Sequence, residues 1–517
     1  MNTSVAQGSF IQYLVGNIEA SGRNPTRVIS GFLAAWILFA LILWVFPRPE
    51  GLSASGMAVL AVVVWASIMW VSEALPVGIT GISVPTLLIL THGIPWIEKK
   101  GKIVPPMEIV FSGFTKHVVW LCLFAFLIGA VMQLLKLDRR IALGILDKIK
   151  ASNVGRVIWG MFFVNIILAF LIPAANARAA TLLPVVKGIT NLLGDTPEEN
   201  EAKKAIIIQS LVYGTMICGV FILTAHLPNL IMIGIFSNNG FEGLGYLDWM
   251  LLQFPYLGMF VLTQWWVRYH FKTGGIKIAG GHAKIQEEHK ALGKMSTAEW
   301  MLVSVFVLIA LLFMMGKGSP IYELHKFQLG VIGLIGILVL FTPGLFPYTW
   351  NQVQAKTIWG TFLLLGGAIT MTAAMSKSGL AQFLADGIHG LVAGHSWWMI
   401  ILIMMVGTHI IRIGMLSNVA AIAMLAPIVF AMAPALDLHP VAFTLLVCDT
   451  DTFAYLLPTQ ITAAVIAYGS DEFSVTDYAK AGWVCILIAI AYGLLIMAPW
   501  YAFLGLPVWD ASVPWPF

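Results

Sequence analysis

The stretch IPAANARAATLLPVV, residues 172–186, places an amide and a guanidinium inside a strongly apolar region. Asn176 and Arg178 are two residues apart, and Pro173 and Pro184 flank them. A guanidinium at membrane depth needs an anionic partner, and its planar fork matches a carboxylate with two parallel hydrogen bonds. Asn176 can bind a substrate oxygen or cap a helix. These residue types predict an anion site. For Arg178 the alternatives are a structural ion pair, or a side chain that extends to the cytoplasmic surface.

A second apolar segment, residues 397–436, also carries polar residues near its middle. They are His409, Arg412, Ser417 and Asn418. Charged side chains inside a membrane should face a cavity, so this segment is expected to turn back on itself. Its length also permits two ordinary spans, which is the alternative interpretation.

Four further titratable residues are candidates for binding a proton or a cation. His226 and His409 can exchange a proton near neutral pH. Asp449 and Asp451 can bind a cation, carry a proton or neutralise a buried arginine such as Arg412. For the histidines, the structural alternative is a hydrogen bond to one backbone carbonyl.

The composition indicates the environment of these residues. Of the 517 residues, 59% are hydrophobic and 10% are charged, whereas about 25% of residues are charged in a soluble domain. The chain is therefore expected to be an integral membrane protein in contact with lipid, without a nucleic-acid partner. The four cysteines lie in apolar segments, which excludes a disulfide framework and offers no metal-ligand spacing. No cofactor is expected apart from a coupling ion.

Hydropathy and charge predict the spans and their orientation. Plain spans are expected at 28–46, 55–72, 77–91, 118–135, 249–267, 299–315, 328–341, 358–375 and 481–505. Basic residues cluster between Lys136 and Arg156 and between Arg268 and Lys294, so both loops should be cytoplasmic. This predicts a cytoplasmic tail over 1–27, a first span over 28–50 and a basic cytoplasmic loop over 271–296. The expected location is the cell inner membrane, with the C-terminus outside.

Two kinds of segment interrupt the plain spans, and each kind occurs twice. In the first half, a re-entrant hairpin over about 157–190 turns near residue 176, and a broken helix follows over about 204–237. In the second half, a hairpin over about 397–434 precedes a broken helix over about 440–469. The expected fold is therefore all-α and polytopic, with about 11 transmembrane helices plus two hairpins.

The order of these segments predicts an internal repeat. Repeat 1 covers 51–270 and repeat 2 covers 297–517, and landmarks such as Leu137 and Leu380 are 243 residues apart. Five crossings separate the two hairpin tips, so the second hairpin should enter from the opposite side of the membrane. Inverted-topology repeats of this kind are typical of secondary transporters, which bind substrate near the midplane.

Several motifs resemble those of the divalent anion:sodium symporter family, which carries di- and tricarboxylates or sulfate. The similarity covers nearly the whole chain after residue 50. The motifs are SEALPVGITGISVPTLLIL near the start, LKLDRRIALGIL and SKSGLAQFLADGI before the hairpins, and LLPTQITAAVIAYGS with YAKAGW near the end. FILTAHLPN, and NAR at the first tip, are closer to the branch with citrate/succinate antiporters and plastid oxoglutarate/malate translocators.

The resemblance implies a set of site residues. In the family, both tips read Ser-Asn-Thr, and tips and broken helices jointly hold carboxylate and sodium. Carried over by position, the substrate-binding residues are Asn176, Ser417, Asn418, Thr224, Asn229 and Thr459, and Arg178 joins them on its chemistry. A sodium ion is implied near Ser417 and Asn418. The first tip has Ala174 and Ala175 instead, which lack the oxygen ligands that a hard cation prefers.

These features predict a secondary active transporter of small divalent organic anions, such as di- or tricarboxylates, and not an enzyme. Hairpins and broken helices would move as a unit past a static scaffold, in an elevator-type mechanism. Sodium symport and anion exchange both stay open, and the two alanines favour exchange. The resemblance implies a homodimer. Alternatives are a sulfate or sulfonate transporter of the same fold, a passive anion channel, and a membrane-embedded hydrolase using His409 or the aspartates.

Overall fold

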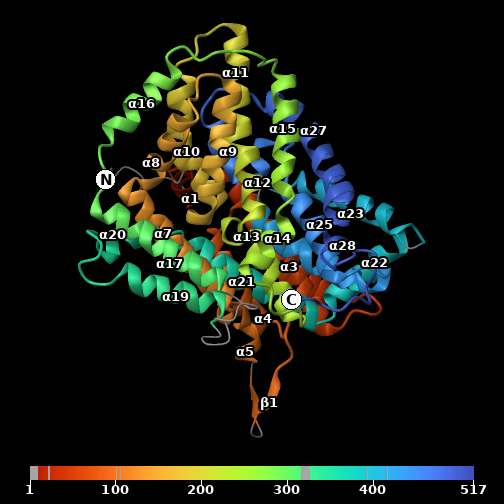
Figure 1. Cartoon of the computed structure of the whole chain (residues 1–517). Helices are drawn as coiled ribbons and strands as arrows, with labels where there is room; N and C mark the ends of the chain where they lie inside the picture. The colour runs from red at the N-terminus through yellow and green to blue at the C-terminus, as the bar shows by residue number, and fades with distance from the viewer. Residues whose placement is uncertain are drawn as a thin grey trace. The chain divides into compact units, whose positions relative to one another are not determined.

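A computed structural model of the chain describes residues 10–20, 24–99, 102–104, 106–315, 327–392, 394–415 and 417–517. Contacts divide the chain into two compact units, which are residues 1–115 with 359–384, and residues 116–358 with 385–517. Helices make up nearly all the regular structure of both units (Figure 1). A helical polytopic membrane protein was the expected fold class, and the structure agrees with it.

The first unit consists of apolar helices and one small hairpin. Its elements are α1 (Phe10–Ala20), α2 (Pro25–Ala40) with a π-helical extension (Leu41–Val45), α3 (Ala54–Ser72), α4 (Val77–Leu90), β1 (Ile97–Lys99), β2 (Lys102–Val104), α5 (Met107–Val110), α6 (Ser112–Thr115), α21 (Trp359–Lys377) and the start of α22 (Leu380–Val392). Helices α4 and α21 pack closely because small residues face one another. A Cβ at Gly81 would lie only 2.7 Å from the carbonyl oxygen of Leu363.

The β1–β2 hairpin departs from the all-α expectation. The strands pair antiparallel, with Ile97 opposite Val104 and Lys99 opposite Lys102. The sequence WIEKKGKIV around it has an apolar pair at each end and a charged centre with one glycine, which suits two short strands joined by a tight turn. The expectation missed it because the segment is too short and too charged to register as a span.

The second unit contains every predicted site residue. Its elements are α7 (His117–Leu135), α8 (Leu137–Lys148), α9 (Val154–Leu171), α10 (Ala175–Thr190), α11 (Pro197–Ile207), the π-helical turn η2 (Ile208–Tyr213), α12 (Gly214–Phe221), the 3₁₀ turn η3 (Leu223–Ala225), α13 (Leu227–Asn238), α14 (Tyr246–Gln253), α15 (Tyr256–His270), α16 (Gly281–Ala291), α17 (Thr297–Met314), α19 (Leu329–Leu340), α20 (Trp350–Lys356), α23 (Trp397–Arg412), α24 (Asn418–Met432), the 3₁₀ turn η4 (Pro434–Leu436), α25 (Pro440–Thr452), the 3₁₀ turn η5 (Pro458–Gln460), α26 (Thr462–Tyr468), α27 (Val475–Tyr492), the π-helical turn η6 (Gly493–Met497) and α28 (Ala498–Phe503). The rest of α22 also belongs to this unit.

Seven helices in the described part of the chain are long and apolar enough to cross a membrane. They are 25–45, 54–72, 117–135, 154–171, 197–221, 359–377 and 475–503. Six shorter apolar helices add to them, which are 77–90, 227–238, 297–313, 329–340, 397–412 and 418–432. One expected span, 249–267, is instead divided into α14 and α15 at Pro255, because proline lacks the N–H that would continue the helix.

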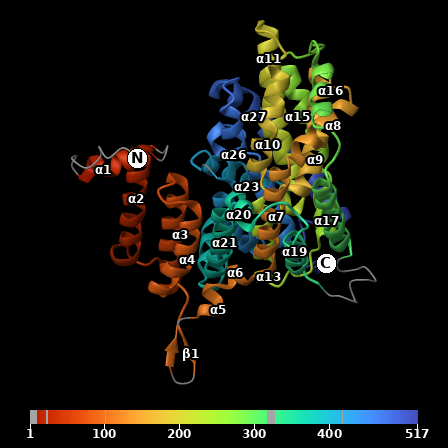
Figure 2. The same cartoon turned by 90° about the vertical axis from the view of Figure 1, so that its left-hand side faces the viewer.

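Four consecutive helices begin at matching positions in the two halves. Helices α8, α9, α10 and α11 begin at residues 137, 154, 175 and 197, and α22, α23, α24 and α25 begin 243 residues later, at 380, 397, 418 and 440. The packing within the second unit is also reciprocal. Helix α10 packs on α26 (Figure 2), and α24 packs on α13, so each half contributes a helix to the other.

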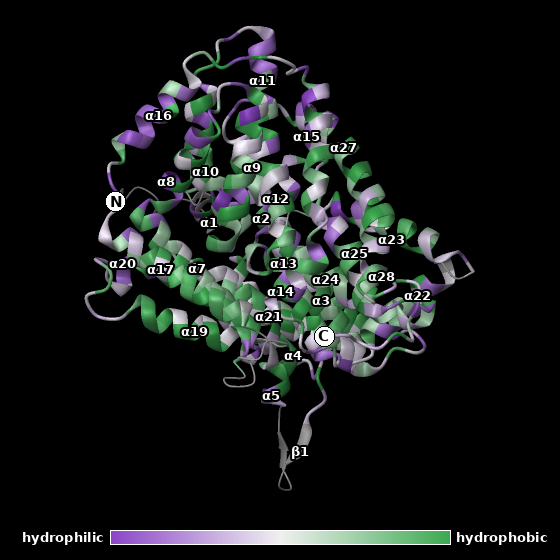
Figure 3. Ribbon diagram, viewed as in Figure 1, coloured by the Kyte–Doolittle hydropathy of each residue, from purple (hydrophilic) through white to green (hydrophobic). Residues whose placement is uncertain are grey.

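Polar residues of the second unit gather at one end of its helix bundle. The start of α11 and most of α16 are hydrophilic, in contrast to α9, α12 and α13 (Figure 3). Helix α16 lies against α8, where Arg139 bonds Glu288 at 3.1 Å and Asp147 accepts hydrogen bonds from His282 and His289. Helix α16, which lies within the basic segment 271–296, is therefore anchored to α8.

Candidate functional site

The first tip is the turn of residues 172–174 between α9 and α10. Helix α9 ends at Leu171, two residues before Pro173, and Ala174 is the N-cap of α10 without a side-chain hydrogen bond. The turn was expected near residue 176, but Asn176 lies in the first turn of α10. The proline sets the position, because its missing N–H and fixed φ suit the start of a helix and not its interior. Asn176 is half-buried and does not cap the helix.

The second tip begins after Arg412, the last residue of α23, and ends at Ser417, the N-cap of α24. The hydroxyl of Ser417 accepts a hydrogen bond from the Ala420 N–H at 3.4 Å. Ser417 and Ala174 are 243 residues apart, so they occupy the same position of the two tips. Because the first tip has alanine where the second has serine, only α24, the return helix of the second hairpin, is capped by a side chain; α10, the return helix of the first, is not.

The first break separates α12 from α13 at residues 222–226. Ile222 and His226 are extended and enclose the 3₁₀ turn η3. The Asn229 side chain donates to the carbonyls of Gly219 and Ile222 at 3.0 and 3.1 Å, which satisfies groups that the end of α12 leaves unpaired. Asn229 is fully buried and acts here as a brace for the break.

The second break, residues 453–461, has the same build. Leu457 and Ile461 are extended and enclose the 3₁₀ turn η5. The Gln460 side chain accepts from the N–H of Leu457 at 2.7 Å and donates to the carbonyl of Arg412 at 3.0 Å. Gln460 was not among the predicted residues, although its position beside Thr459 at the break was a usable signal. Thr459 itself is exposed.

Arg178 is fully buried and binds backbone carbonyls on three sides. Its Nη1 donates to Ile172 in the tip and to Ala225 in the break, both at 2.8 Å, and its Nη2 donates to Thr215 in α12 at 2.9 Å. Among the residues that the structure describes, no carboxylate pairs with it, and its Nε has no acceptor. Within the described part of the chain, the guanidinium thus has no counter-charge.

Arg412 is also fully buried, but it has an acidic partner. Its Nε lies 3.4 Å from Asp451 Oδ2, and its Nη groups donate to the carbonyls of Met415 and Gln460 at 3.1 and 2.8 Å. It also donates to Oδ1 of Asn418. Asp451 is therefore the aspartate that neutralises Arg412, which was one of the roles expected for it.

Other predicted residues have partners inside the unit. The hydroxyl of Thr224 lies 3.0 Å from that of Tyr246. Asp449 accepts from the Gln253 amide at 2.7 Å, so it is not a second partner of Arg412. His409 bonds the carbonyl of Met405 in its own helix at 2.9 Å, which is the structural alternative expected for a buried histidine.

The structure thus brings Asn418, His226, Arg178 and Arg412 together around the two breaks, while Asp449 bonds Gln253 in α14 and His409 bonds Met405 in its own helix. Gln253, Gln460 and Asn165 were missed. Asn165 in α9 donates to the carbonyl of Ser210 at 2.9 Å, a group that the π-helical turn η2 leaves available. A lone buried amide inside an apolar helix was the signal for it.

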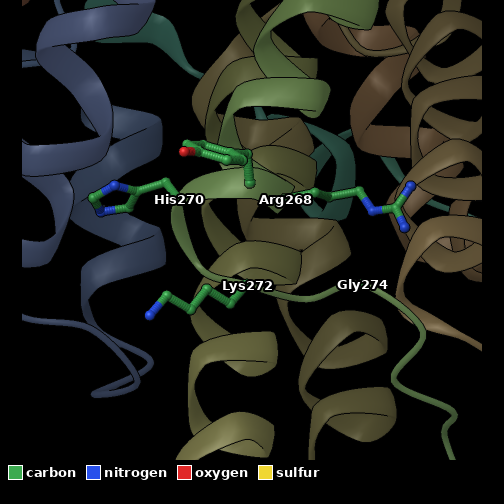
Figure 4. A pocket seen from close by; sticks show the side chains of 5 residues that line it. Arg268, His270, Lys272 and Gly274 are labelled. Atoms are coloured by element: carbon green, nitrogen blue, oxygen red, sulfur yellow. The ribbon is translucent and has the colours of Figure 1, made fainter.

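A surface pocket of about 530 Å³ lies elsewhere, at the end of α15. It is lined by Arg268, Tyr269, His270, Lys272 and Gly274. Arg268 points to one side of the chain, whereas His270 and Lys272 point to the other (Figure 4). Its cationic groups do not converge, and it contains none of the predicted site residues.

Apolar helices of membrane-spanning length, together with two tips and two helix breaks that meet inside one unit, define a polytopic membrane transporter. The sequence profile described as "Sodium:sulfate symporter transmembrane region" matches residues 29–507. The chain belongs to this family, which confirms its resemblance to the divalent anion:sodium symporters. It is a transporter and not an enzyme.

Individual relatives are distant in sequence but similar over their whole length. A Cupriavidus necator protein described as "Membrane protein" is 28% identical over 91% of this chain and 93% of its own. "Sodium-dependent dicarboxylate transporter SdcS" of Staphylococcus saprophyticus is 25% identical over 95% of this chain and 94% of its own. The solved Alcanivorax borkumensis YdaH transporter has a TM-score of 0.53 at 14% identity, covering 84% of this chain and 100% of that one, which shows similarity of fold alone.

Proposed function

We propose that the chain is a secondary active transporter of small divalent organic anions, namely di- or tricarboxylates. The observation that carries this proposal is the difference between the two buried arginines. Arg412 has Asp451 beside it, whereas Arg178 has no acidic partner among the described residues. A buried charge is stable only with a counter-charge, so Arg178 needs an anion from outside the protein.

In this proposal, substrate lies between the two tips. The Nε edge of Arg178 faces one carboxylate, and the half-buried Asn176 and Ser417 supply polar contacts. Asn418, Thr224, Asn229 and Thr459 complete the predicted set. Asn418, Thr224 and Asn229 already bond protein groups, so their contribution is to shape the site, and Thr459 is exposed at the second break.

The transport cycle that we propose is of the elevator type. The 243-residue offset of four helix starts and the reciprocal packing of α10 on α26 and α24 on α13 support an inverted-topology repeat. Repeats 51–270 and 297–517 would then supply two re-entrant hairpins and about 11 spans. The protein would be a homodimer in the cell inner membrane, with its N-terminus cytoplasmic and its C-terminus outside.

Sodium is the coupling ion that the named relatives support, but the tips of this chain are poor ligands for it. At the first tip, Ala174 and Ala175 have no side-chain oxygen. At the second tip, the Asn418 oxygen accepts a hydrogen bond from a guanidinium, which repels a cation. Hard cations need several free oxygen ligands. We therefore favour anion exchange over sodium symport, with Asp449, Asp451, His226 and His409 as candidates for coupling to an ion or a proton.

Sulfate or a sulfonate is the second candidate substrate, because the description of the family names sulfate. These anions also match a guanidinium fork. Competition distinguishes the two classes, because a dicarboxylate carrier is inhibited far more by unlabelled succinate or malate than by equal concentrations of sulfate.

Uptake of labelled succinate by proteoliposomes tests the proposal. We expect uptake to accelerate with internal succinate, to persist without a sodium gradient, and to be lost in Arg178→Gln. Arg139→Gln, at the α8–α16 contact, is the matched control and should transport normally. Strict dependence on an inward sodium gradient, with no acceleration by internal substrate, would refute exchange. Saturable uptake that is unchanged in Arg178→Gln would refute the role of Arg178.

A further inference from the structure

The two buried arginines make the same pair of contacts in the two halves of the second unit. Arg178 donates to one carbonyl in the first tip, that of Ile172, and to one in the first break, that of Ala225. Arg412 donates to the carbonyl of Met415 in the second tip, and to that of Gln460 in the second break. Each guanidinium therefore spans the gap between a hairpin and the broken helix of the same half.

The carbonyl groups that accept these hydrogen bonds occupy equivalent positions in the two halves. Ile172 and Met415 are 243 residues apart, the same offset as the helix starts. Ala225 and Gln460 are the last residues of the two 3₁₀ turns, η3 and η5. The contact thus repeats in position as well as in kind.

The arginines themselves are not equivalent. Arg178 lies in the first turn of the return helix α10, whereas Arg412 ends the first arm α23. At the 243-residue offset, the counterpart of Arg178 is Ala421 and that of Arg412 is Ala169. In each half, an arginine bonds one carbonyl of the tip and one of the break. In the first half this arginine follows the tip in sequence, and in the second half it precedes the tip.

Charge-assisted bonds suit these carbonyls. Turns and helix breaks leave carbonyls without a partner inside the helix, and no water replaces one at membrane depth. A guanidinium offers five N–H groups on a rigid plane, so a single side chain can join several such carbonyls. Loss of the guanidinium leaves all of them unsatisfied at once.

We propose that Arg178 and Arg412 are positioning residues, each of which binds its own tip to its own break, so that a hairpin and its broken helix move as one body. Arg178 does this through its Nη groups, which leaves its Nε edge for substrate. The Nη groups of Arg412 also bond protein groups, and its Nε faces the Asp451 carboxylate at 3.4 Å as an ion pair, so its role is positioning alone. The inference concerns the site of the proposed transporter, but it predicts a local structural effect that does not require transport.

Hydrogen exchange of the purified full-length protein, followed by mass spectrometry of its peptides, tests this inference. Arg412→Gln alone would strand the Asp451 carboxylate, so the pair to compare is Arg412→Gln/Asp451→Asn with Asp451→Asn, which differ only in the guanidinium. We expect the double variant to exchange at least about tenfold faster at the second tip and second break, with no change at the first. Arg178→Gln should loosen the first tip and first break and leave the second unchanged. Arg140→Gln is the control and should loosen neither half, because Arg140 lies in α8 and bonds Glu299 of α17, outside both tips. Equal loosening of both halves, or none, would overturn the proposal.

Succinate exchange in proteoliposomes gives a second, independent readout. A positioning residue should lower the maximal rate of Arg412→Gln/Asp451→Asn by about tenfold or more, relative to Asp451→Asn, with little change in KM. A KM that rises about tenfold at an unchanged rate would make Arg412 a substrate ligand and overturn its positioning role. If the wild-type protein does not transport succinate, the proposed function fails, and the hydrogen-exchange result still decides the role of the arginines.

Discussion

Asn418 Nδ2 lies 3.4 Å from His226 Nε2, so the start of α24 contacts the first break across 192 positions of sequence. The same amide donates to the carbonyl of Thr452 at 3.3 Å, and its oxygen accepts from Arg412. With Nε2 of His226 as the acceptor, the ring hydrogen lies on Nδ1. This contact joins the second tip to the first break.

His226→Phe should destabilise the protein. Phenylalanine has a similar ring but no acceptor, so the buried Asn418 amide would lose one partner, at a cost of about 1–3 kcal/mol. We expect a lower melting temperature of the purified protein in detergent. His226→Gln, which can place an acceptor near the same position, should lose less. If phenylalanine and glutamine give the same melting temperature, the Asn418–His226 contact contributes nothing to stability.

The unequal caps of the two return helices predict opposite effects of two matched substitutions. Ser417→Ala removes the hydroxyl that caps α24, and should cost about 1 kcal/mol. Ala174→Ser, at the equivalent uncapped position of α10, should stabilise the protein by up to about the same amount. Both changes are measurable as shifts in melting temperature. A fall in melting temperature with Ala174→Ser would show that the first tip has no room for a cap.

Gly219→Ala should impair both stability and transport. A Cβ at this position would lie 3.1 Å from Arg178 Nη2 and 3.4 Å from the Cβ of His226, so the guanidinium would have to shift away from its carbonyls. Overpacking of this kind costs about 1–3 kcal/mol. We expect slower succinate exchange per folded molecule. Gly188→Ala is the control, because its nearest neighbour, a Glu288 oxygen, lies 4.0 Å away. Normal exchange by Gly219→Ala would argue against a fixed position for Arg178.

The attachment of α16 to α8 should weaken in acid. Hydrogen bonds from His289 Nδ1, at 3.0 Å, and from His282 Nε2, at 3.1 Å, hold the pKa of Asp147 below its usual value. A carboxyl group with a lowered pKa stabilises the folded state above about pH 4, and this contribution disappears as the pH falls through the folded pKa. Hydrogen exchange of residues 281–291 should therefore accelerate on acidification, beyond the intrinsic effect of pH.

Asp147→Asn provides the matched test of this contact. It should loosen residues 281–291 already at neutral pH and remove the additional acid response. Glu287→Gln, which changes a carboxylate on the exposed side of the same helix, is the control and should behave as wild type. Unchanged protection of α16 in Asp147→Asn at neutral pH would contradict the prediction.

The sequence alone predicts the class of protein and much of the helical layout. Long apolar segments require helices in a membrane, because only a helix satisfies its own backbone there, and prolines and capping residues determine where those helices end. The expected span 118–135 is helix 117–135, and Pro173 and Ser417 mark the two tips. The β1–β2 hairpin and the division at Pro255 were missed, since both are local interruptions smaller than a span.

Only the tertiary structure decided the partners of the polar residues. Arg178 and Arg412 look alike in sequence, as single arginines in apolar segments. The fold gives Arg412 the carboxylate of Asp451, whereas the partners of Arg178 among the described residues are carbonyls, from residues up to 47 positions away. Likewise, Asn418 meets His226 because the two halves pack reciprocally. Helix ends are encoded within a few residues of sequence, whereas these contacts depend on the packing of distant segments, and local propensity does not specify that packing.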